Sequence, residues 1–263
     1  MRAELIGQYT NNSQLARVFT ENWIAQNGYC LACESDRILA TKANTKARDF
    51  ECNRCGHPYE LKGSQKAFAS TVVDGAYRSM IRRIESNTVA SLLLMRYSLA
   101  TQLPTDLLVV HRSLITREVI QQRKPLAITA RRAGWIGCNI LLSGIPPEGR
   151  IPLIVNSIEI RREASRAKFQ ATEQLASRSA AERSWSRAVL NCLHRLPNRT
   201  FNLSDVYSFE TELGVLFPMN RHVRPKIRQQ LQFLRAAGLV TSDTRGHYEL
   251  VSRQAGGGDP HAI

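Results

Sequence analysis

The sequence predicts an α/β protein in which helices flank a mixed sheet that carries an inserted four-cysteine zinc site, followed by a small α+β domain. Three observations lead to this fold class. Two CxxC pairs lie near the N-terminus, apolar segments with strand and helix periodicity alternate as far as Gln174, and three helical segments with a hairpin follow. The length of 263 residues suits one large and one small domain, and a hydrophobic content of 43% is enough for a core in each.

The cysteine spacing indicates a zinc site. Two CxxC motifs are separated by 18 residues, and four thiolates at this spacing can close tetrahedrally on one Zn²⁺. The four cysteines are Cys30, Cys33, Cys52 and Cys55. Cys138 and Cys192 stand far away in apolar surroundings, so we expect them to be buried free thiols in a reducing compartment.

Acidic and basic residues are interleaved with the second cysteine pair. Asp49 precedes this pair and Glu60-Leu61-Lys62 follows it. If the two segments are neighbouring strands, Glu60 and Lys62 share one face while Leu61 turns into the core. A divalent cation between Asp49 and Glu60, with the ammonium beside it, is what a metal-dependent phosphodiesterase needs. The pattern alone also fits a solvated hairpin, but a zinc site between the strands would hold both carboxylates in place.

The periodicity predicts the remaining elements of the first domain. A helix should run from Asn11 to Gly28, and a second should bury the i, i+4 series from Phe68 through Ile84, with Arg78, Arg82 and Arg83 toward solvent. We read the segment from Val119 to Ile140 as a basic, DNA-facing loop that ends in a strand, although its Trp135 and arginines also fit a core anchor and solvated charges. Further strands are expected at Val89–Met95, Asp106–His111 and Gly149–Val155, a helix at Ile158–Gln174, and a domain boundary at Ser177–Arg183.

The C-terminal segment has the element order of a winged helix. Its helices are expected at Trp185–Leu196, Leu203–Leu216 and Arg224–Ala237, before a hairpin that turns at Thr244-Arg245-Gly246. The third helix would bury Ile227 and Leu231 and expose Arg228, Gln229 and Gln232, a face that suits the major groove or is merely solvated. We therefore divide the chain into domains at 1–180 and 181–253, with a disordered tail at 254–263.

The charge balance points to a polyanionic partner. The formal net charge is +14, from 36 Lys and Arg against 22 Asp and Glu, and nucleic acid is the default candidate. No apolar run reaches 18 residues and the N-terminus has no hydrophobic signal region, so we expect neither a membrane span nor secretion. The expected location is the cytoplasm of a bacterium, and the expected state is a monomer.

Three sequence blocks resemble the DpnI-like, methyl-directed (type IIM) restriction endonucleases. The blocks are Asp74-Gly75-Ala76-Tyr77, Gln122 to Ile140, and Lys226 to Gln232, within a similarity that extends from about Asn12 to about Leu250. The resemblance implies a restriction-endonuclease-like PD-(D/E)XK catalytic domain with a zinc site, followed by a winged helix. It also implies Mg²⁺-dependent cleavage of double-stranded DNA at GATC that carries methyladenine.

The same resemblance implies roles for single residues. Asp49, Glu60 and Lys62 match the catalytic set, with Asp49, Glu60 and the Leu61 carbonyl as Mg²⁺ ligands, and the four CxxC cysteines match the zinc ligands. The residues expected to contact DNA or its methyl groups are Trp135, Arg131, Arg132, Arg224, Arg228 and Gln229. This chain departs from the pattern at Arg48, which replaces a proline, at Glu51, which could share the metal, and at the less basic turn Gly63-Ser64-Gln65.

Two alternatives stay open at this point. Some zinc-stapled nucleases use an HNH site, but only His57 lies near the cysteines and the other histidines are scattered singly. The alternative from another class is a non-catalytic DNA-binding regulator, or reader of methylated DNA, built from the zinc site and the winged helix. Cleavage in the presence of Mg²⁺ distinguishes it from a nuclease.

Overall fold

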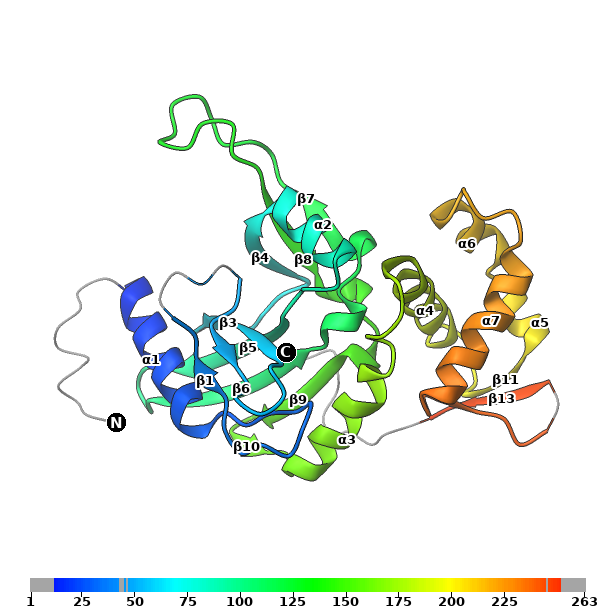
Figure 1. The fold of residues 1–263 in the computed structure, drawn as a ribbon, viewed down its shortest axis with the longest axis horizontal. Helices are drawn as coiled ribbons and strands as arrows, with labels where there is room; N and C mark the ends of the chain where they lie inside the picture. Colours follow the sequence, from blue (N-terminus) through cyan, green and yellow to red (C-terminus); the bar gives the residue numbers. More distant parts are fainter. Residues whose placement is uncertain (1–11, 43–44, 46, 245, 252–263) are drawn as a thin grey trace.

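A seven-stranded mixed sheet forms the centre of the larger domain (Figure 1). The computed structural model describes residues 12–42, 45, 47–244 and 246–251. The strand order is β1-β2-β3-β5-β6-β9-β10, in which β3 and β5 are parallel and the other neighbours are antiparallel. The strands are β1 Leu39–Ala40, β2 Phe50–Glu51, β3 Pro58–Ser64, β5 Ser91–Ser98, β6 Leu103–Val110, β9 Arg150–Val155 and β10 Ile158–Glu159.

The central strand β5 is apolar on both faces because helices cover both sides of the sheet. Leu92 and Leu94 belong to the core that includes the buried side of α2 (Tyr77–Glu85), whereas Leu93 and Met95 belong to the core under α1 (Asn12–Asn27) and α3 (Arg162–Glu173). Alternate residues of a strand point to opposite faces, so an uninterrupted apolar run is what a covered central strand requires. The expected strand at Val89–Met95 and the expected N-terminal helix are thereby confirmed.

A second, three-stranded sheet covers the α2 side of the molecule. Its order is β4-β8-β7, with β4 at Thr71–Ala76, β7 at Ile120–Gln122 and β8 at Gly137–Leu141. Residues 123–136, which connect β7 to β8 and are called the arm below, project away from the body of the protein (Figure 1). Short 3-10 turns at Arg112–Leu114, Arg117–Val119, Leu142–Gly144 and Pro147–Gly149 complete the connections.

The expected helix from Phe68 to Ile84 is wrong in its first half. Thr71, Val72 and Val73 form strand β4, and the helix begins only at Tyr77. β-branched residues favour strands, and Gly75 disfavours a helix interior. Val72 is buried opposite Ile140, so its apolar side chain faces the core from a strand, as it would from the expected helix.

The C-terminal domain has the arrangement of a winged helix. Helices α4 (Ala180–Leu193), α5 (Leu203–Tyr207), α6 (Glu210–Leu216) and α7 (Val223–Ala236) lie against a small sheet of order β11-β13-β12 (Figure 1). The strands are β11 Thr200–Asn202, β12 Val240–Thr241 and β13 His247–Leu250. Arg245 of the expected turn and the expected tail at 254–263 lie outside the described residues.

The single helix expected over Leu203–Leu216 is two helices. Asn202 caps α5 by accepting hydrogen bonds from the backbone N–H groups of Ser204 and Asp205. Ser208 then donates its hydroxyl to the Asp205 carbonyl at 2.6 Å, which satisfies one of the last carbonyls of α5 where the helix ends. Polar side chains that bond to the nearby backbone therefore divide the segment.

Helix α4 lies between the two parts of the chain. Arg187 donates to the Thr116 hydroxyl at 2.9 Å and to the Gly144 carbonyl at 3.0 Å, while Ser186 donates to Gln230 of α7 at 2.7 Å. Arg183, expected in an aperiodic boundary segment, is buried and donates to the Ile84 carbonyl at 2.8 Å. Among the described residues, no helix combines the length and apolar character that a membrane crossing requires.

Candidate active site and zinc site

The four cysteines of the CxxC motifs come together as the sequence predicts. Their Sγ atoms all lie within 4.8 Å of one another, with Cys30 and Cys55 at 3.6 Å and Cys33 and Cys52 also at 3.6 Å. Tetrahedral zinc with Zn–S bonds of about 2.3 Å requires sulfurs separated by about 3.8 Å. The cluster could therefore hold a structural zinc ion with little rearrangement.

Four cysteines this close together can all be deprotonated only if a cation offsets their negative charges. Burial raises the pKa of Cys30, and burial together with the neighbouring thiols raises the pKa of Cys55. The Tyr59 hydroxyl lies 3.5 Å from the Cys30 sulfur and accepts a hydrogen bond from the backbone of Leu31 at 3.0 Å. Because divalent zinc favours the deprotonated form of its thiol ligands, the donor set and its surroundings fit zinc.

Helix α3 braces the first cysteine pair. Arg166 donates from Nε to the Cys30 carbonyl and from Nη2 to the Ser35 carbonyl, each at 3.0 Å. Its guanidinium also lies 5.3 Å from the centre of the Tyr29 ring. Contacts to the backbone of a metal-binding loop orient the ligands, so Arg166 would support a zinc ion held by this cluster.

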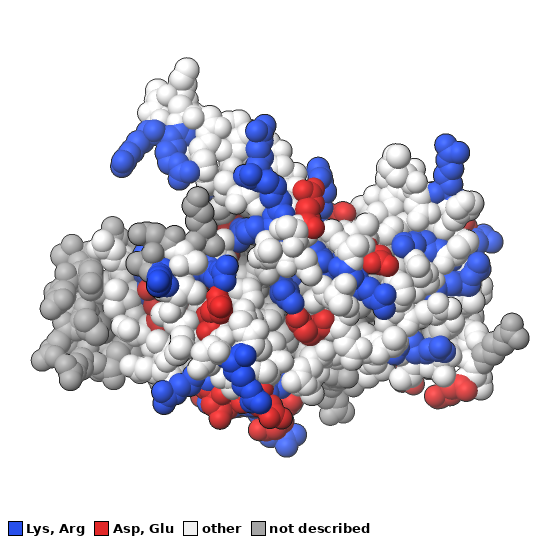
Figure 2. Space-filling view, viewed as in Figure 1, with Lys and Arg blue, Asp and Glu red and all other residues white. Residues whose placement is uncertain are grey.

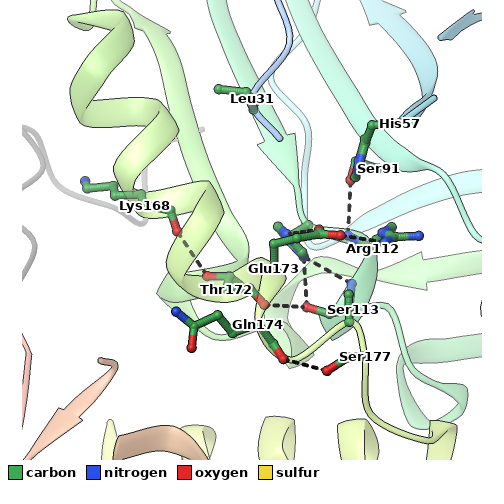
Figure 3. Close-up of polar contacts among 12 residues, drawn as sticks. Leu31, His57, Ser91, Arg112, Ser113, Lys168, Thr172, Glu173, Gln174 and Ser177 are labelled. Atoms are coloured by element: carbon green, nitrogen blue, oxygen red, sulfur yellow. Dashed lines mark hydrogen bonds and ion pairs between the residues drawn. The ribbon is translucent and has the colours of Figure 1, made fainter. Parts of the chain in front are cut away.

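A buried polar network braces the second pair (Figure 3). His57 Nε2 lies 3.0 Å from the Ser91 hydroxyl on β5, which also accepts the backbone N–H of Arg112 at 3.3 Å. Arg112 donates a hydrogen bond to the carboxylate of Glu173 on α3, and the same carboxylate lies 2.9 Å from His111 Nε2. Burial lowers the pKa of His57 to about 3, so this imidazole is neutral and supports the scaffold, which disfavours the HNH alternative.

The candidate catalytic acid Asp49 is fastened to strand β3. Its backbone N–H donates to the Tyr59 carbonyl at 2.8 Å, and its Oδ2 accepts the N–H of Leu61 at 2.8 Å. The N–H and C=O of one strand residue point to the same side of the strand, so the Leu61 carbonyl also points toward Asp49. A carboxylate and a carbonyl are hard oxygen donors, and the pair fits one side of a Mg²⁺ site.

Glu60 and Lys62 lie on the same face of β3, as their spacing predicts, and Leu61 packs against the opposite core. The Lys62 ammonium is 2.7 Å from Glu60 Oε1 and 2.9 Å from Asp74 Oδ1. Arg83 lies 3.6 Å from Glu60, so the expectation that it faces solvent is wrong. Two carboxylates attract this guanidinium out of water, a tertiary effect that helical periodicity does not report.

Electrostatics keep the lysine charged. Burial acts to lower the pKa of Lys62, but the carboxylates of Glu60 and Asp74 outweigh it and raise the pKa. Burial likewise acts to raise the pKa of Asp74, and the adjacent ammonium overcomes it and lowers the pKa. Lys62 is therefore a fixed cation at neutral pH.

The structure shows where the residues that depart from the resembled family pattern lie. Glu51 is ion-paired with Arg48 at 2.6 Å, and both side chains are exposed. Gly63 and Ser64 form the end of β3 rather than a turn. A Cβ on Gly63 would stand 2.7 Å from Thr20 Cγ2, so glycine allows α1 to approach the strand of the candidate catalytic residues.

Trp135 lies at the base of the arm, half-buried. A Cβ on Gly137 would stand 2.9 Å from the Trp135 ring, so the ring rests against the backbone there. The Arg132 guanidinium lies 4.7 Å from the centre of the same ring, and Arg131 is exposed beside it. Residues 123–136 contain Arg and Lys but no Asp or Glu, and Ile128 is 92% exposed.

The predicted contact residues of the winged helix lie on exposed positions of α7. Arg224 pairs with Glu210 at 2.7 Å, Arg228 donates to the Tyr207 hydroxyl at 2.8 Å, and Gln229 accepts from Lys226 at 2.7 Å. Figure 2 shows Lys and Arg side chains on the arm, on the C-terminal domain and on the body between them. The predicted DNA-contact residues thus occupy two places in the fold, the arm and α7.

Sequence comparison with known protein families agrees with this architecture. Residues 1–178 match the DpnI family, described as the Dam-replacing family. Residues 181–250 match the Dam-replacing HTH domain. The two matches meet at the connection that leads into α4.

Proposed function

The chain belongs to the Dam-replacing DpnI family, and on that premise we propose that it is a methyl-directed, type II restriction endonuclease. Its substrate is double-stranded DNA that carries methyladenine in GATC, and its reaction is Mg²⁺-dependent hydrolysis of a phosphodiester bond. The observation that carries the proposal is the pairing of Asp49 with the Leu61 backbone beside the ion-paired Glu60 and Lys62. The four-cysteine cluster lies at the other end of the same hairpin.

The divalent cation would be held by the carboxylates of Asp49 and Glu60 and by the Leu61 carbonyl. When bound, Mg²⁺ supplies Lewis-acid polarisation of the scissile phosphate and lowers the pKa of a bound water. Glu51 is a less suitable ligand because it is already paired with Arg48 and exposed to solvent. We therefore assign the first acidic ligand to Asp49.

The protein's own contribution is a positioned cation and a rigid frame. Lys62 is held between two carboxylates and carries a positive charge, which orients the attacking water and stabilises charge that develops on the phosphate. Such charges act more strongly where they are partly removed from water, and the Lys62 side chain is only 24% exposed. The frame consists of β3 between β2 and β5, with the four-cysteine cluster at the turn of the β2–β3 hairpin.

Two surfaces would read the DNA. Trp135, held between Arg132 and Gly137, supplies an apolar wall for the methyl groups, and Arg131 and Arg132 bind phosphates or base edges. Arg224, Arg228 and Gln229 of α7 would enter a second major-groove site. Because one methyl contact discriminates by only about 1–3 kcal/mol, two modest readers on one chain give a larger combined preference.

We further propose that the units are a catalytic domain at 1–180 and a winged-helix domain at 181–253. The chain would act as a monomer in the bacterial cytoplasm, where its DNA substrate is found.

The proposal is tested by incubating adenine-methylated and unmethylated plasmid with the purified protein and Mg²⁺. We expect discrete fragments from the methylated plasmid alone, and no cleavage when EDTA replaces Mg²⁺. Binding of methylated DNA without any cleavage would support the regulator instead. Cleavage of both plasmids would leave an unselective nuclease.

A further inference from the structure

A carboxylate from the second sheet reaches the candidate catalytic lysine. Asp74 lies on β4, which pairs with β8 rather than with any strand of the seven-stranded sheet. Its side chain is 2% exposed, and its Oδ1 is 2.9 Å from the Lys62 ammonium. Oδ2 has no hydrogen-bond partner among the described residues, and Arg83 Nη2 lies 3.9 Å from it.

Two acids and two basic side chains meet in this cluster. Glu60 and Asp74 face Lys62 and Arg83, and all four side chains are no more than 24% exposed. A buried carboxylate is tolerated only when it is paired, and an ammonium has three donors in directions that its partners fix. Lys62 uses two of them, on acids from two different sheets.

Glu60 and Asp74 have different roles if the proposed function is correct. Glu60 is needed as a ligand of the divalent cation, and its bond to Lys62 competes with that role. Asp74 comes from β4 of the other sheet and is not one of the proposed metal ligands, so it can keep its bond to Lys62 throughout. A lysine with a long flexible stem loses its position when such a partner is removed.

Strand pairing and hydrogen bonds hold the segment around Asp74 in place. It stands opposite Cys138 at the start of β8, next to a bulge between Asp74 and Ala76. Cys138 donates to the Gly75 carbonyl at 3.4 Å, and Tyr77 donates its N–H to the Ile136 carbonyl at 3.1 Å. Lys62 is thus held from β4, the strand that pairs with β8 at the base of the arm.

We propose that Asp74 is a positioning residue that fixes Lys62 for catalysis from the second sheet. This inference rests on the proposed function. Asp74→Asn keeps the size of the side chain and removes its charge, so Lys62 loses one of its two anionic partners. Asp74→Glu keeps the charge and shifts the carboxylate by one methylene.

The first experiment separates cleavage from binding. With methylated duplex, Asp74→Asn should lower the single-turnover cleavage rate on the order of 10-fold to 100-fold, while DNA affinity measured with Ca²⁺ in place of Mg²⁺ stays within about 3-fold. Asp74→Glu should recover part of the rate. A matched control is Asp106→Asn, which breaks a buried ion pair with Arg96 elsewhere in the sheet and should leave the cleavage rate unchanged. An undiminished rate in Asp74→Asn, or a parallel loss in Asp106→Asn, overturns the proposal.

The second experiment does not depend on activity. Urea unfolding of the wild type, Asp74→Asn, Lys62→Met and the double variant measures the coupling between the two side chains. We expect Asp74→Asn to destabilise the wild type more than it destabilises Lys62→Met, because the carboxylate has no ammonium to pair with in that background. Additive effects overturn the proposed link. If the wild type does not cleave DNA at all, the proposed function fails, and this cycle still decides whether Asp74 holds Lys62.

Discussion

Asp49 Oδ2 accepts a hydrogen bond from the backbone N–H of Leu61 at 2.8 Å, so the first acid is tied to the strand that carries Glu60 and Lys62. The bond orients one carboxylate oxygen toward β3 and leaves the other available. Because the Leu61 carbonyl points to the same side, a backbone and a side-chain oxygen converge there. This relationship distinguishes Asp49 from Glu51, whose carboxylate is turned to Arg48.

Removal of a catalytic group should abolish cleavage and spare binding. Asp49→Ala, Glu60→Ala and Lys62→Ala should each lower the cleavage rate at least about 100-fold, because they act on the scissile phosphate and not on base edges. Affinity for methylated duplex should change little. Glu51→Ala is the matched control and should cut normally, as measured by single-turnover cleavage. An inactive Glu51→Ala with an active Asp49→Ala would reverse the assignment of the first acid.

Zinc should be stoichiometric and structural. Elemental analysis should give about one zinc per chain, and Cys52→Ala should lose the metal, unfold at a lower temperature and lose cleavage, because zinc contributes folding free energy in small metal sites. Cys192→Ala removes a buried thiol that lies outside the cluster and should retain zinc. An active preparation with far less than one zinc per chain would contradict the assignment.

Trp135 should carry methyl discrimination. Trp135→Ala should reduce the difference in binding free energy between methylated and unmethylated duplex by roughly 1–3 kcal/mol, with a smaller effect on total affinity. Titrations at one fixed salt concentration measure both quantities. Ile128→Ala, at the exposed tip of the same arm, is a control for the loss of an apolar side chain. Unchanged discrimination in Trp135→Ala would make the ring a structural anchor.

The winged helix should contribute specific affinity. Arg228→Ala and Gln229→Ala remove exposed side chains of α7 and should each weaken binding to methylated GATC by about 1–3 kcal/mol while leaving the folded structure intact. Arg195→Ala, which breaks an exposed pair with Glu212 outside α7, is a suitable control. Loss of affinity that is equal for every DNA sequence would indicate phosphate contacts alone.

Acid should weaken the network behind the zinc site. Burial opposes the charge of Glu173, but His111 and Arg112 lower its pKa to about 2, below the ordinary value of 4.5. The stabilisation from this carboxylate is therefore complete above about pH 4.5 and is lost as the pH falls toward 2. The difference in unfolding free energy between wild type and Glu173→Gln should be constant near neutrality and shrink over that range. A difference that grows on acidification would contradict the assignment.

The geometry of the hairpin with the candidate catalytic residues could be predicted because its information is local. Alternation along β3 places Glu60 and Lys62 on one face, and the CxxC spacing defines the metal cluster. Neither inference needs knowledge of distant contacts. The order of helices and hairpin likewise predicts the winged helix, although it does not indicate the break between α5 and α6.

The positions of the buried charged residues depend on tertiary contacts. Asp74 and Arg83 occur in a segment whose apolar residues suit a helix, but Asp74 lies on β4 and its carboxylate reaches Lys62. Arg183 falls in the segment expected as a domain boundary, yet both it and Arg187 are buried where α4 meets the larger domain. Buried charges of this kind follow from what surrounds them, which periodicity does not encode.

The most direct test uses two short duplexes that differ only in the methyl groups of a single GATC. With Mg²⁺ and excess protein, we expect rapid cleavage of the methylated duplex, cleavage at least about 100-fold slower without methylation, and none in Lys62→Ala. Equal rates on both duplexes, or cleavage that survives Lys62→Ala, would contradict it.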